Sequence, residues 1–297
     1  MQLGMIGFGE VGFEMARGYK GAGLDGIIAY DVLQDHPVYG TLVKERIESS
    51  GATMVSLPEQ VLQHADVLIV AVPGSKALET AKGLRRFLKK DTLYIDVSAS
   101  APTVKQSIWE EIKGSGVYFV DGAMLGPLSV YQHKVPTLIS GNGSDLFLKL
   151  MSPYGMDLEK VSDIPGEATA IKLVRSIFMK GLPALMLEVL EAASIMKVDH
   201  LVLKSLADTM NASPFEQTMN RLVTGSSIHA ERRVHEMENV IEMLEGIEVK
   251  PTMSEATRER LQWLASKNLK EKFAGKAPKQ WQEVVKAWEE AAGGTSI

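Results

Sequence analysis

The sequence predicts an α/β domain built on a doubly wound parallel sheet, followed by an all-helical domain. Short apolar runs alternate with helix-length segments from residue 2 to about 161, which is the pattern of a parallel sheet with helical crossovers. Beyond Pro165 few strand candidates remain, and long helical patterns take their place. We therefore expect two domains, 1–165 and 166–297.

The expected elements follow from apolar periodicity and from turn residues. In the first domain we expect strands at 3–6, 27–30, 53–55, 67–72, 92–96, 118–120, 137–140 and 158–162, and helices at 10–22, 37–49, 75–86 and 102–115. In the second we expect helices at 168–196, 200–210, 214–224, 229–244, 254–268 and 278–292. Only the tail, 293–297, is expected to be disordered.

Composition excludes several classes of protein. Apolar residues make up 45% of the 297, and 32 Lys and Arg stand against 37 Asp and Glu. No basic excess or cluster suggests nucleic-acid binding. The absence of cysteine excludes disulfides, thiolate zinc sites and a cysteine nucleophile. The six histidines do not form a helical zinc pair, so we expect no metal site.

The chain is expected to be a cytoplasmic protein without a membrane span. A strand-like run begins at Gln2, which leaves no room for a signal peptide. The most apolar later stretch, 177–187, is interrupted by Lys180, Gly181 and Pro183, and is too short to cross a bilayer.

A glycine-rich sequence directly follows the first expected strand and opens the first helix. It reads Gly7, Phe8, Gly9, Glu10, Val11, Gly12 and fits G-x-G-x-x-G. Gly7 permits a tight turn, Gly9 allows backbone to approach a pyrophosphate, and Gly12 lets helix pack closely on strand. The helix N-terminus would supply unpaired N–H groups to the phosphates. The context predicts a Rossmann-type dinucleotide site rather than an ordinary glycine-rich turn.

Asp31 ends the second expected strand, nineteen residues after Gly12. A carboxylate there can bind the adenosine ribose hydroxyls and would repel a 2′-phosphate. No Arg or Lys lies between Asp31 and Lys44 to bind that phosphate. We therefore expect NAD rather than NADP, while FAD stays open.

Three loops after strands carry further candidates, because ligands bind beyond the carboxyl ends of the strands in open α/β sheets. Val72 and Pro73 could flank a nicotinamide, although Ser75 could simply cap a helix there. Ser98 could bind cofactor or substrate, while Ser100 looks like the N-cap of the next helix. Gly126 could bring a backbone N–H close to a substrate anion, and Asp121 could be a site residue or an ordinary turn acid.

The long helix carries the sharpest chemical pattern. Lys172, Ser176 and Lys180 recur every four residues, so they share one face, and Arg175 lies beside them. The rest of the stretch is apolar nearly all round, which predicts burial. A buried lysine needs a reason to be there, such as proton transfer beside an anionic substrate. The alternative is a solvent-facing cationic stripe. Burial of this helix also predicts a homodimer formed through the helical domain.

The chain resembles the β-hydroxyacid dehydrogenase and 6-phosphogluconate dehydrogenase superfamily. The resemblance rests on the glycine fingerprint, the Ser98 loop, the Asp121 to Pro127 loop and the run Gly166 to Lys172. It implies that Lys172 is the general base of hydride transfer to a nicotinamide. The helical domain resembles a compact branch of that superfamily, many of whose members have no assigned substrate.

The chain departs from that superfamily's pattern at three places. Leu125-Gly126-Pro127 stands where many members have Ser-Gly-Gly, and Ser176 stands where they usually have Asn. Met179 matches the glutamate acid of the phosphogluconate enzymes, which argues against their decarboxylating chemistry.

The sequence thus predicts an NAD-dependent oxidoreductase acting on a small anionic hydroxy acid or a related polar alcohol. Lys172 would move the proton, and Ser98, Asp121, Gly126, Arg175, Ser176 and Lys180 would bind substrate. Two alternatives stay open: reduction of an imine, and a non-catalytic dinucleotide-binding role.

Overall fold

The computed structural model describes residues 1–291. The chain divides into two compact units, an N-terminal unit of Met1–Ile177 and a C-terminal unit that begins at Phe178. The division falls inside the long helix α8 (Glu167–Ile195), whereas the sequence pattern changes at residue 165, where the strands end. The tail expected to be disordered, 293–297, lies outside the described residues.

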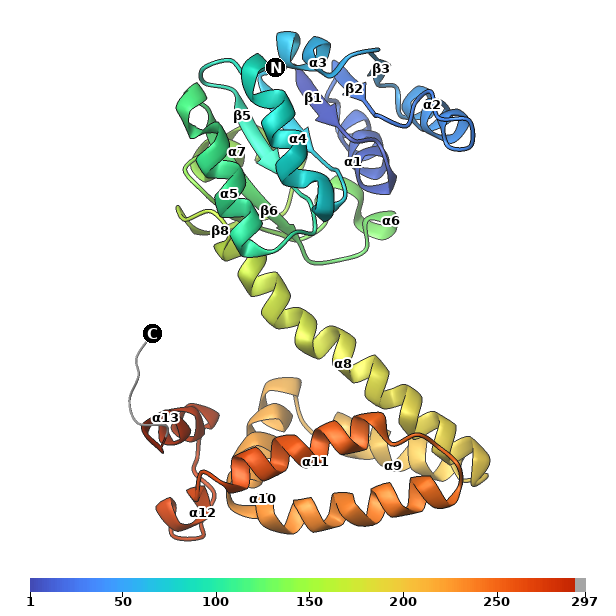
Figure 1. Cartoon of the computed structure of the whole chain (residues 1–297), viewed down its shortest axis with the longest axis vertical. Coiled ribbons are helices and arrows are strands. Elements are labelled where there is room, and N and C mark those ends of the chain that lie inside the picture. Colours follow the sequence, from blue (N-terminus) through green and yellow to red (C-terminus); the bar gives the residue numbers. More distant parts are fainter. Residues whose placement is uncertain (292–297) are drawn as a thin grey trace. The chain divides into compact units, whose positions relative to one another are not determined.

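The N-terminal unit is built on one eight-stranded sheet with the order β3-β2-β1-β4-β5-β6-β7-β8 (Figure 1). Its strands are β1 (Leu3–Ile6), β2 (Ile27–Tyr30), β3 (Thr53–Met54), β4 (Val67–Val70), β5 (Leu93–Asp96), β6 (Tyr118–Met124), β7 (Thr137–Ser140) and β8 (Leu158–Ser162). All neighbouring pairs are parallel except β6 and β7. The predicted doubly wound fold is confirmed, with one antiparallel pairing that the sequence did not predict.

Two hydrophobic cores cover the two faces of this sheet. Alternate side chains of a strand point to opposite faces, so Met5 and Ile69 join one core while Ile6 and Leu68 join the other. Helices α1 (Glu10–Gly21), α2 (Gly40–Ser50) and α7 (Ser144–Met151) supply the first core. Helices α3 (Pro58–His64), α4 (Ala77–Leu84) and α5 (Pro102–Ile112) supply the second, and α4 and α5 pack side by side there (Figure 1). Burial on both faces explains the apolar run of β4.

Several expected helices start or end elsewhere. Helix α2 begins at Gly40, three residues beyond Pro37, because 37–39 form a turn. The segment expected as one helix at 75–86 has 3₁₀ turns at Gly74–Lys76 and Arg85–Phe87 on either side of α4. Helices α3, α7 and the short α6 (Leu128–Tyr131) were not predicted, since each has eight residues or fewer and gives little periodicity.

The C-terminal unit is helical. Besides the end of α8 it contains α9 (Asp199–Asn211), α10 (Phe215–Gly246), α11 (Thr252–Ala265), α12 (Leu269–Lys272) and α13 (Trp281–Ala291). The prediction of two helices at 214–224 and 229–244 is wrong, because α10 runs unbroken through Gly225. Among residues 1–291, no helix is long and apolar enough to cross a membrane.

Glu188 of α8 fixes the start of α11 within the C-terminal unit. Its carboxylate accepts the N–H groups of Met253 (2.6 Å) and Ser254 (2.9 Å), and the Ser254 hydroxyl donates to it at 2.7 Å. Burial alone raises the pKa of Glu188, but these hydrogen bonds outweigh it and leave the pKa below its ordinary value of 4.5. The charged carboxylate therefore stabilises the fold.

Replacing Glu188 with Gln should lower the free energy of unfolding at pH 7 by about 1–3 kcal/mol, the usual worth of hydrogen bonds to a charged group. Because the folded-state pKa is depressed, this contribution is present above pH 4.5 and is lost as the pH falls through the folded value. The gap between wild type and variant should therefore narrow in acid. Urea unfolding followed by tryptophan fluorescence at several pH values checks this.

Glu191→Gln is the matched control, since Glu191 is exposed on the same helix. Equal destabilisation by both changes would contradict a specific role of Glu188.

Candidate dinucleotide and catalytic site

The strand order reverses its direction of growth between β1 and β4. From β1 the chain builds outward to β2 and β3, then returns to β4 and builds the other way. In open α/β sheets, ligands bind at such a switch point, outside the carboxyl ends of the strands. The glycine-rich loop after β1 lies at this place.

Each glycine of the loop has the geometry that a dinucleotide cradle requires. Gly7 has φ of +90°, and a Cβ there would lie 2.5 Å from the carbonyl oxygen of Ala71. A Cβ on Gly12 would lie 2.4 Å from the carbonyl oxygen of Gly7, so helix α1 packs directly on the turn. A Cβ on Gly9 would meet no atom within 4 Å. The two outer glycines are thus required by the fold, whereas Gly9 leaves open space at the N-terminus of α1.

Asp31 ties the end of β2 to this loop. Its Oδ2 accepts the N–H of Phe8 at 2.6 Å, and its Oδ1 accepts the N–H of Leu33 at 2.8 Å. A carboxylate has about four acceptor positions, so these two bonds leave capacity for hydroxyl groups. The nearest following lysine, Lys44, is paired with Asp35 at 3.1 Å.

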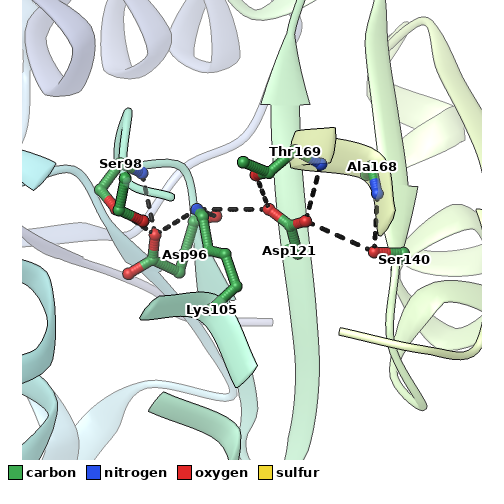
Figure 2. Close-up of polar contacts among 8 residues, drawn as sticks. Asp96, Ser98, Lys105, Asp121, Ser140, Ala168 and Thr169 are labelled. Carbon is green, nitrogen blue, oxygen red and sulfur yellow. Dashed lines mark hydrogen bonds and ion pairs between the residues drawn. The ribbon is translucent and has the colours of Figure 1, made fainter. Parts of the chain in front are cut away.

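A row of polar residues crosses the other half of the sheet. Asp96 at the end of β5 is in register with Asp121 of β6, and Asp121 is in register with Ser140 of β7. Residues in register point to the same face, and here that face is the one covered by α4 and α5. Figure 2 shows these side chains meeting in one cluster.

Lys105 of α5 lies at the centre of this cluster and is fully buried. Its Nζ is 2.9 Å from the carbonyl oxygen of Asp96, 2.5 Å from Asp96 Oδ1 and 3.3 Å from Asp121 Oδ1. All three ammonium protons thus have an acceptor. Oδ2 of Asp96 has no hydrogen-bond partner among the described residues.

Asp121 and Ser140 together cap the N-terminus of α8. The N–H of Thr169 donates to Asp121 Oδ2 at 2.9 Å, and its hydroxyl donates to Asp121 Oδ1 at 2.6 Å. The N–H of Ala168 donates to the Ser140 hydroxyl at 3.1 Å. Asp121 is fully buried and engaged by the chain itself, so in this structure it fixes where α8 begins.

The hydroxyl of Ser98 is already committed as a donor. It donates to Asp96 Oδ1 at 2.5 Å, and the Ser98 N–H donates to the same oxygen at 3.0 Å. A hydroxyl has one proton and two lone pairs. Ser98 therefore presents an acceptor to a ligand, which suits an alcohol or amide group better than a carboxylate. The expected N-cap of α5 is wrong: that position is Ala101, and the Ser100 hydroxyl lies 3.2 Å from that of Ser98.

Lys172 and Ser176 follow Thr169 at three and seven residues, so all three share one face of α8. Both are half-buried. Because Thr169 is bonded to Asp121, this face of the helix begins at the polar row of the sheet. The structure thus brings the lysine-bearing face and the Ser98 loop to the two sides of one cluster within the N-terminal unit.

α8 carries two further cations. Arg175 and Lys180 are exposed, and Lys180 belongs to the C-terminal unit. The expectation that α8 is buried all round is wrong for the single chain, since Val174 and Ile177 are 68% and 76% exposed. An apolar pattern predicts that a helix is covered, but none of the described residues 1–291 covers Val174 or Ile177.

The loops after β4 and β5 lie against each other. A Cβ on Gly74 would be 2.4 Å from the carbonyl oxygen of Ala99, so the segment that carries Val72 and Pro73 packs directly on the Ser98 loop. After β6, a Cβ on Gly126 would be 3.3 Å from Val135 and 3.4 Å from Tyr131. Gly126 therefore packs tightly within its own loop.

Sequence reasoning missed Asp96 and Lys105 as parts of this site. One pattern could have found Lys105. It precedes Ile108 and Ile112 at three and seven residues, and all three are buried residues of α5. A lysine on the core face of a short helix is rarely buried unless it is paired.

Two family models match the chain. The NAD binding domain of 6-phosphogluconate dehydrogenase matches residues 2–142, and a domain of unknown function, DUF1932, matches residues 193–264. The first covers the glycine loop, Asp31, Ser98 and Asp121. The second lies within the helical C-terminal unit.

Known proteins match most of the chain or about half of it. An uncharacterised 28.5 kDa protein of Methanothermus fervidus is 28% identical over 87% of this chain and 96% of its own length. Mitochondrial 3-hydroxyisobutyrate dehydrogenase of mouse is 30% identical over 49% of this chain and 42% of that enzyme. The chain therefore matches less than half the length of that enzyme.

Solved structures extend the likeness. A conserved protein of unknown function, described as structurally similar to 3-hydroxyacid dehydrogenases, is 28% identical with a TM-score of 0.60, covering 91% of this chain and 99% of that one. An imine reductase of Myxococcus stipitatus in complex with NAD⁺ has a TM-score of 0.73 at 13% identity, covering 96% and 98%. The second likeness shows a shared fold alone.

The N-terminal unit is thus an NAD-binding domain of the Rossmann type, carried by an oxidoreductase-like chain. The chain belongs to the β-hydroxyacid dehydrogenase and 6-phosphogluconate dehydrogenase superfamily, in a branch with a DUF1932 helical domain.

The glycine geometry predicts that alanine at position 9 affects cofactor binding, whereas alanine at position 12 affects stability. Gly9→Ala should leave the melting temperature unchanged, because its Cβ meets nothing and its φ of −68° suits alanine. It should weaken NADH binding at least about tenfold, or ~1.4 kcal/mol, by holding the pyrophosphate away from the backbone. Gly12→Ala should instead lower the melting temperature, because its Cβ strikes Gly7.

Fluorescence titration with NADH and thermal unfolding measure the two effects. Gly21→Ala, at the other end of α1 and equally open, is the control and should change neither. Full NADH affinity in Gly9→Ala would remove the pyrophosphate from this loop.

Proposed function

We propose that this protein is an NAD-dependent dehydrogenase that oxidises a small hydroxy acid or related polar alcohol, with Lys172 as general base. One observation carries the proposal. The face of α8 that bears Lys172 and Ser176 begins at Thr169, which Asp121 holds at 2.9 Å and 2.6 Å beside the Ser98 loop. A base and a substrate-side acceptor are therefore tied to the same sheet as the NAD-binding loop.

The glycine loop fits a bound dinucleotide. Gly9 leaves open space where a pyrophosphate would approach, and the N-cap of α1 has no side-chain partner. The first turn of α1 can therefore offer N–H groups to phosphate oxygens. When bound, the nicotinamide supplies the acceptor of the hydride.

The chain's own residues supply the rest of the chemistry. The neutral amine of Lys172 takes the hydroxyl proton as the carbon gives up its hydride, so the alcohol becomes a carbonyl. Ser176 donates a hydrogen bond beside it, and Ser98 offers a lone pair. Arg175 supplies positive charge for an anionic substrate, and Gly126 lets backbone approach it. Val72 and Pro73 flank the nicotinamide.

We propose that the protein prefers NAD over NADP because of Asp31. A carboxylate that accepts ribose hydroxyls would stand against a 2′-phosphate. Lys44, the first lysine that follows, is already paired with Asp35. Asp31 is negatively charged, and Lys44 already pairs with Asp35, so neither of them provides a free positive charge for the 2′-phosphate.

We propose in addition that the protein forms a homodimer through its helical domain. Large apolar residues of α8 are exposed in the single chain: Ile171, Leu173, Val174, Ile177, Phe178, Met179, Leu185, Met186, Leu187, Leu190 and Ile195. A monomer rarely exposes so much apolar surface on one element. A second copy of the chain is the occupant that would cover it.

A panel of small 2- and 3-hydroxy acids with NAD⁺, followed by NADH absorbance, tests the activity. It begins with 3-hydroxyisobutyrate, the substrate in the name of the mouse relative. For a substrate found, Lys172→Met should lower kcat by roughly 10²–10⁴-fold, the worth of a positioned proton-transfer group. Lys82→Met, at an exposed position of α4, is the control; a wild-type kcat in Lys172→Met would remove the base.

The same panel separates the two alternatives. Ketoacids with NADH and an added amine would reveal imine reduction if turnover needs the amine. Tight NADH binding with no turnover of any compound would favour a non-catalytic dinucleotide-binding protein.

Asp31→Asn should weaken NAD⁺ binding and raise the ratio of NADP⁺ to NAD⁺ affinity by about tenfold, or ~1.4 kcal/mol, because the repelling charge is removed. Calorimetric titration with both cofactors measures this. Asp25→Asn, an exposed carboxylate paired with Lys20, should leave the ratio unchanged. An unaltered ratio in Asp31→Asn would refute the ribose contact.

Size-exclusion chromatography with light scattering tests the homodimer. Wild type should elute at twice the mass of one chain, and Leu187→Glu, at a position that is 69% exposed, should shift it toward the monomer. Leu57→Glu, at an exposed apolar position of the N-terminal unit, should leave the dimer intact. A monomeric wild type would end this proposal.

A further inference from the structure

Lys105 is a fully buried charged residue for which the proposed reaction provides no role. We propose that Lys105 is a positioning residue that holds the Ser98 loop and the first turn of α8, and with it Lys172, in one fixed arrangement. The inference deepens the proposed function and rests on it for the role of Lys172.

The ammonium of Lys105 connects two parts of the chain that no other side chain of the cluster connects directly. On one side it bonds to Asp96, whose Oδ1 at 2.5 Å also accepts the hydroxyl and N–H of Ser98. On the other side it pairs at 3.3 Å with Asp121 Oδ1, the atom that accepts the Thr169 hydroxyl. Through these two carboxylates, the ammonium of Lys105 therefore joins the Ser98 loop to the first turn of α8 (Figure 2).

The path from Lys105 to Lys172 is short. Asp121 accepts both the N–H and the hydroxyl of Thr169, and Lys172 follows one turn later on the same face. A shift or rotation of the Asp121 carboxylate therefore moves the start of the helix that carries the base.

The start of α5 also contacts the start of α8. Gly166 has φ of +97°, and a Cβ there would lie 2.7 Å from the carbonyl oxygen of Pro102. The N-termini of both helices thus lie at this cluster, which holds two carboxylates and one ammonium. Their dipoles favour the remaining negative charge, so the arrangement needs both helices in place.

A purely stabilising role is the alternative. Removing Lys105 would leave two carboxylates facing each other in a dry interior, which is costly whatever their function. A test must therefore restore the net charge of the cluster without restoring the contact that joins the Ser98 loop to the first turn of α8.

Two variants of the full chain separate the roles. Lys105→Met removes the ammonium and fills a similar volume. Lys105→Met with Asp96→Asn removes one positive and one negative charge, so the net charge of the cluster is unchanged, and the new amide oxygen can still accept from Ser98. Lys113→Met is the control, since Lys113 pairs with Glu110 on the surface at the end of the same helix.

Amide hydrogen exchange of the peptide that contains Ala168 and Thr169 is the main readout, because it needs no substrate. If Lys105 positions α8, both variants should exchange there about tenfold faster or more than wild type, and the control should not. The double variant should at the same time recover most of the melting temperature lost in the single one. NADH affinity should stay at the wild-type value in the Lys113→Met control.

A double variant with recovered stability and wild-type exchange at Ala168 and Thr169 would overturn the proposal, and Lys105 would only balance charge. If Lys105→Met does not fold, the double variant decides alone. With a hydroxy acid that wild type oxidises, the double variant should also lose about tenfold or more in kcat with an unchanged KM for NAD⁺. Wild type that oxidises no compound would contradict the proposed function, while the exchange measurement would still decide the role of Lys105.

Discussion

The arrangement of the N-terminal unit depends on one buried ion cluster. The ammonium of Lys105 bonds to two carboxylates of neighbouring strands, Asp96 at the end of β5 and Asp121 within β6. Burial of these charges is costly unless each is paired, so the three side chains hold one another in place. The Asp121 carboxylate in turn caps the helix that carries Lys172.

The sheet is divided chemically along its strand order. On the β1 side, backbone geometry dominates: three glycines shape a loop whose N–H groups and open space suit a phosphate. On the β5 and β6 side, side chains dominate, with Asp96, Asp121 and Ser140 in register across three strands. The single antiparallel pairing, β6 with β7, brings the end of β7 beside the middle of β6. Ser140 can therefore share the cap of α8 with Asp121.

The sequence predicted the features that depend on local pattern. The fingerprint from Gly7 to Gly12, the apolar strand β4 and the fold class could be read directly, because turn chemistry and periodicity act over a few residues. The pairing of Lys105 with Asp96 and Asp121 could not be predicted, since it depends on the register between β5 and β6. The continuity of α10 through Gly225 was missed because tertiary packing overrode a weak helix former. The exposure of α8 was missed for a different reason. An apolar pattern predicts that a helix is covered, but it does not say whether the same chain or another molecule covers it.

The pairing of the two buried carboxylates with one buried ammonium limits how the sequences of related chains can diverge. A neutral residue in place of Lys105 strands an unbalanced carboxylate in the interior, and a neutral residue in place of Asp96 leaves the cation with one anion fewer. Substitution at either site alone is thus penalised, while simultaneous substitution of both restores stability without restoring the fixed start of α8. We expect the identities at 96, 105 and 121 to be inherited as a set, whereas surface pairs such as Lys113 with Glu110 vary independently.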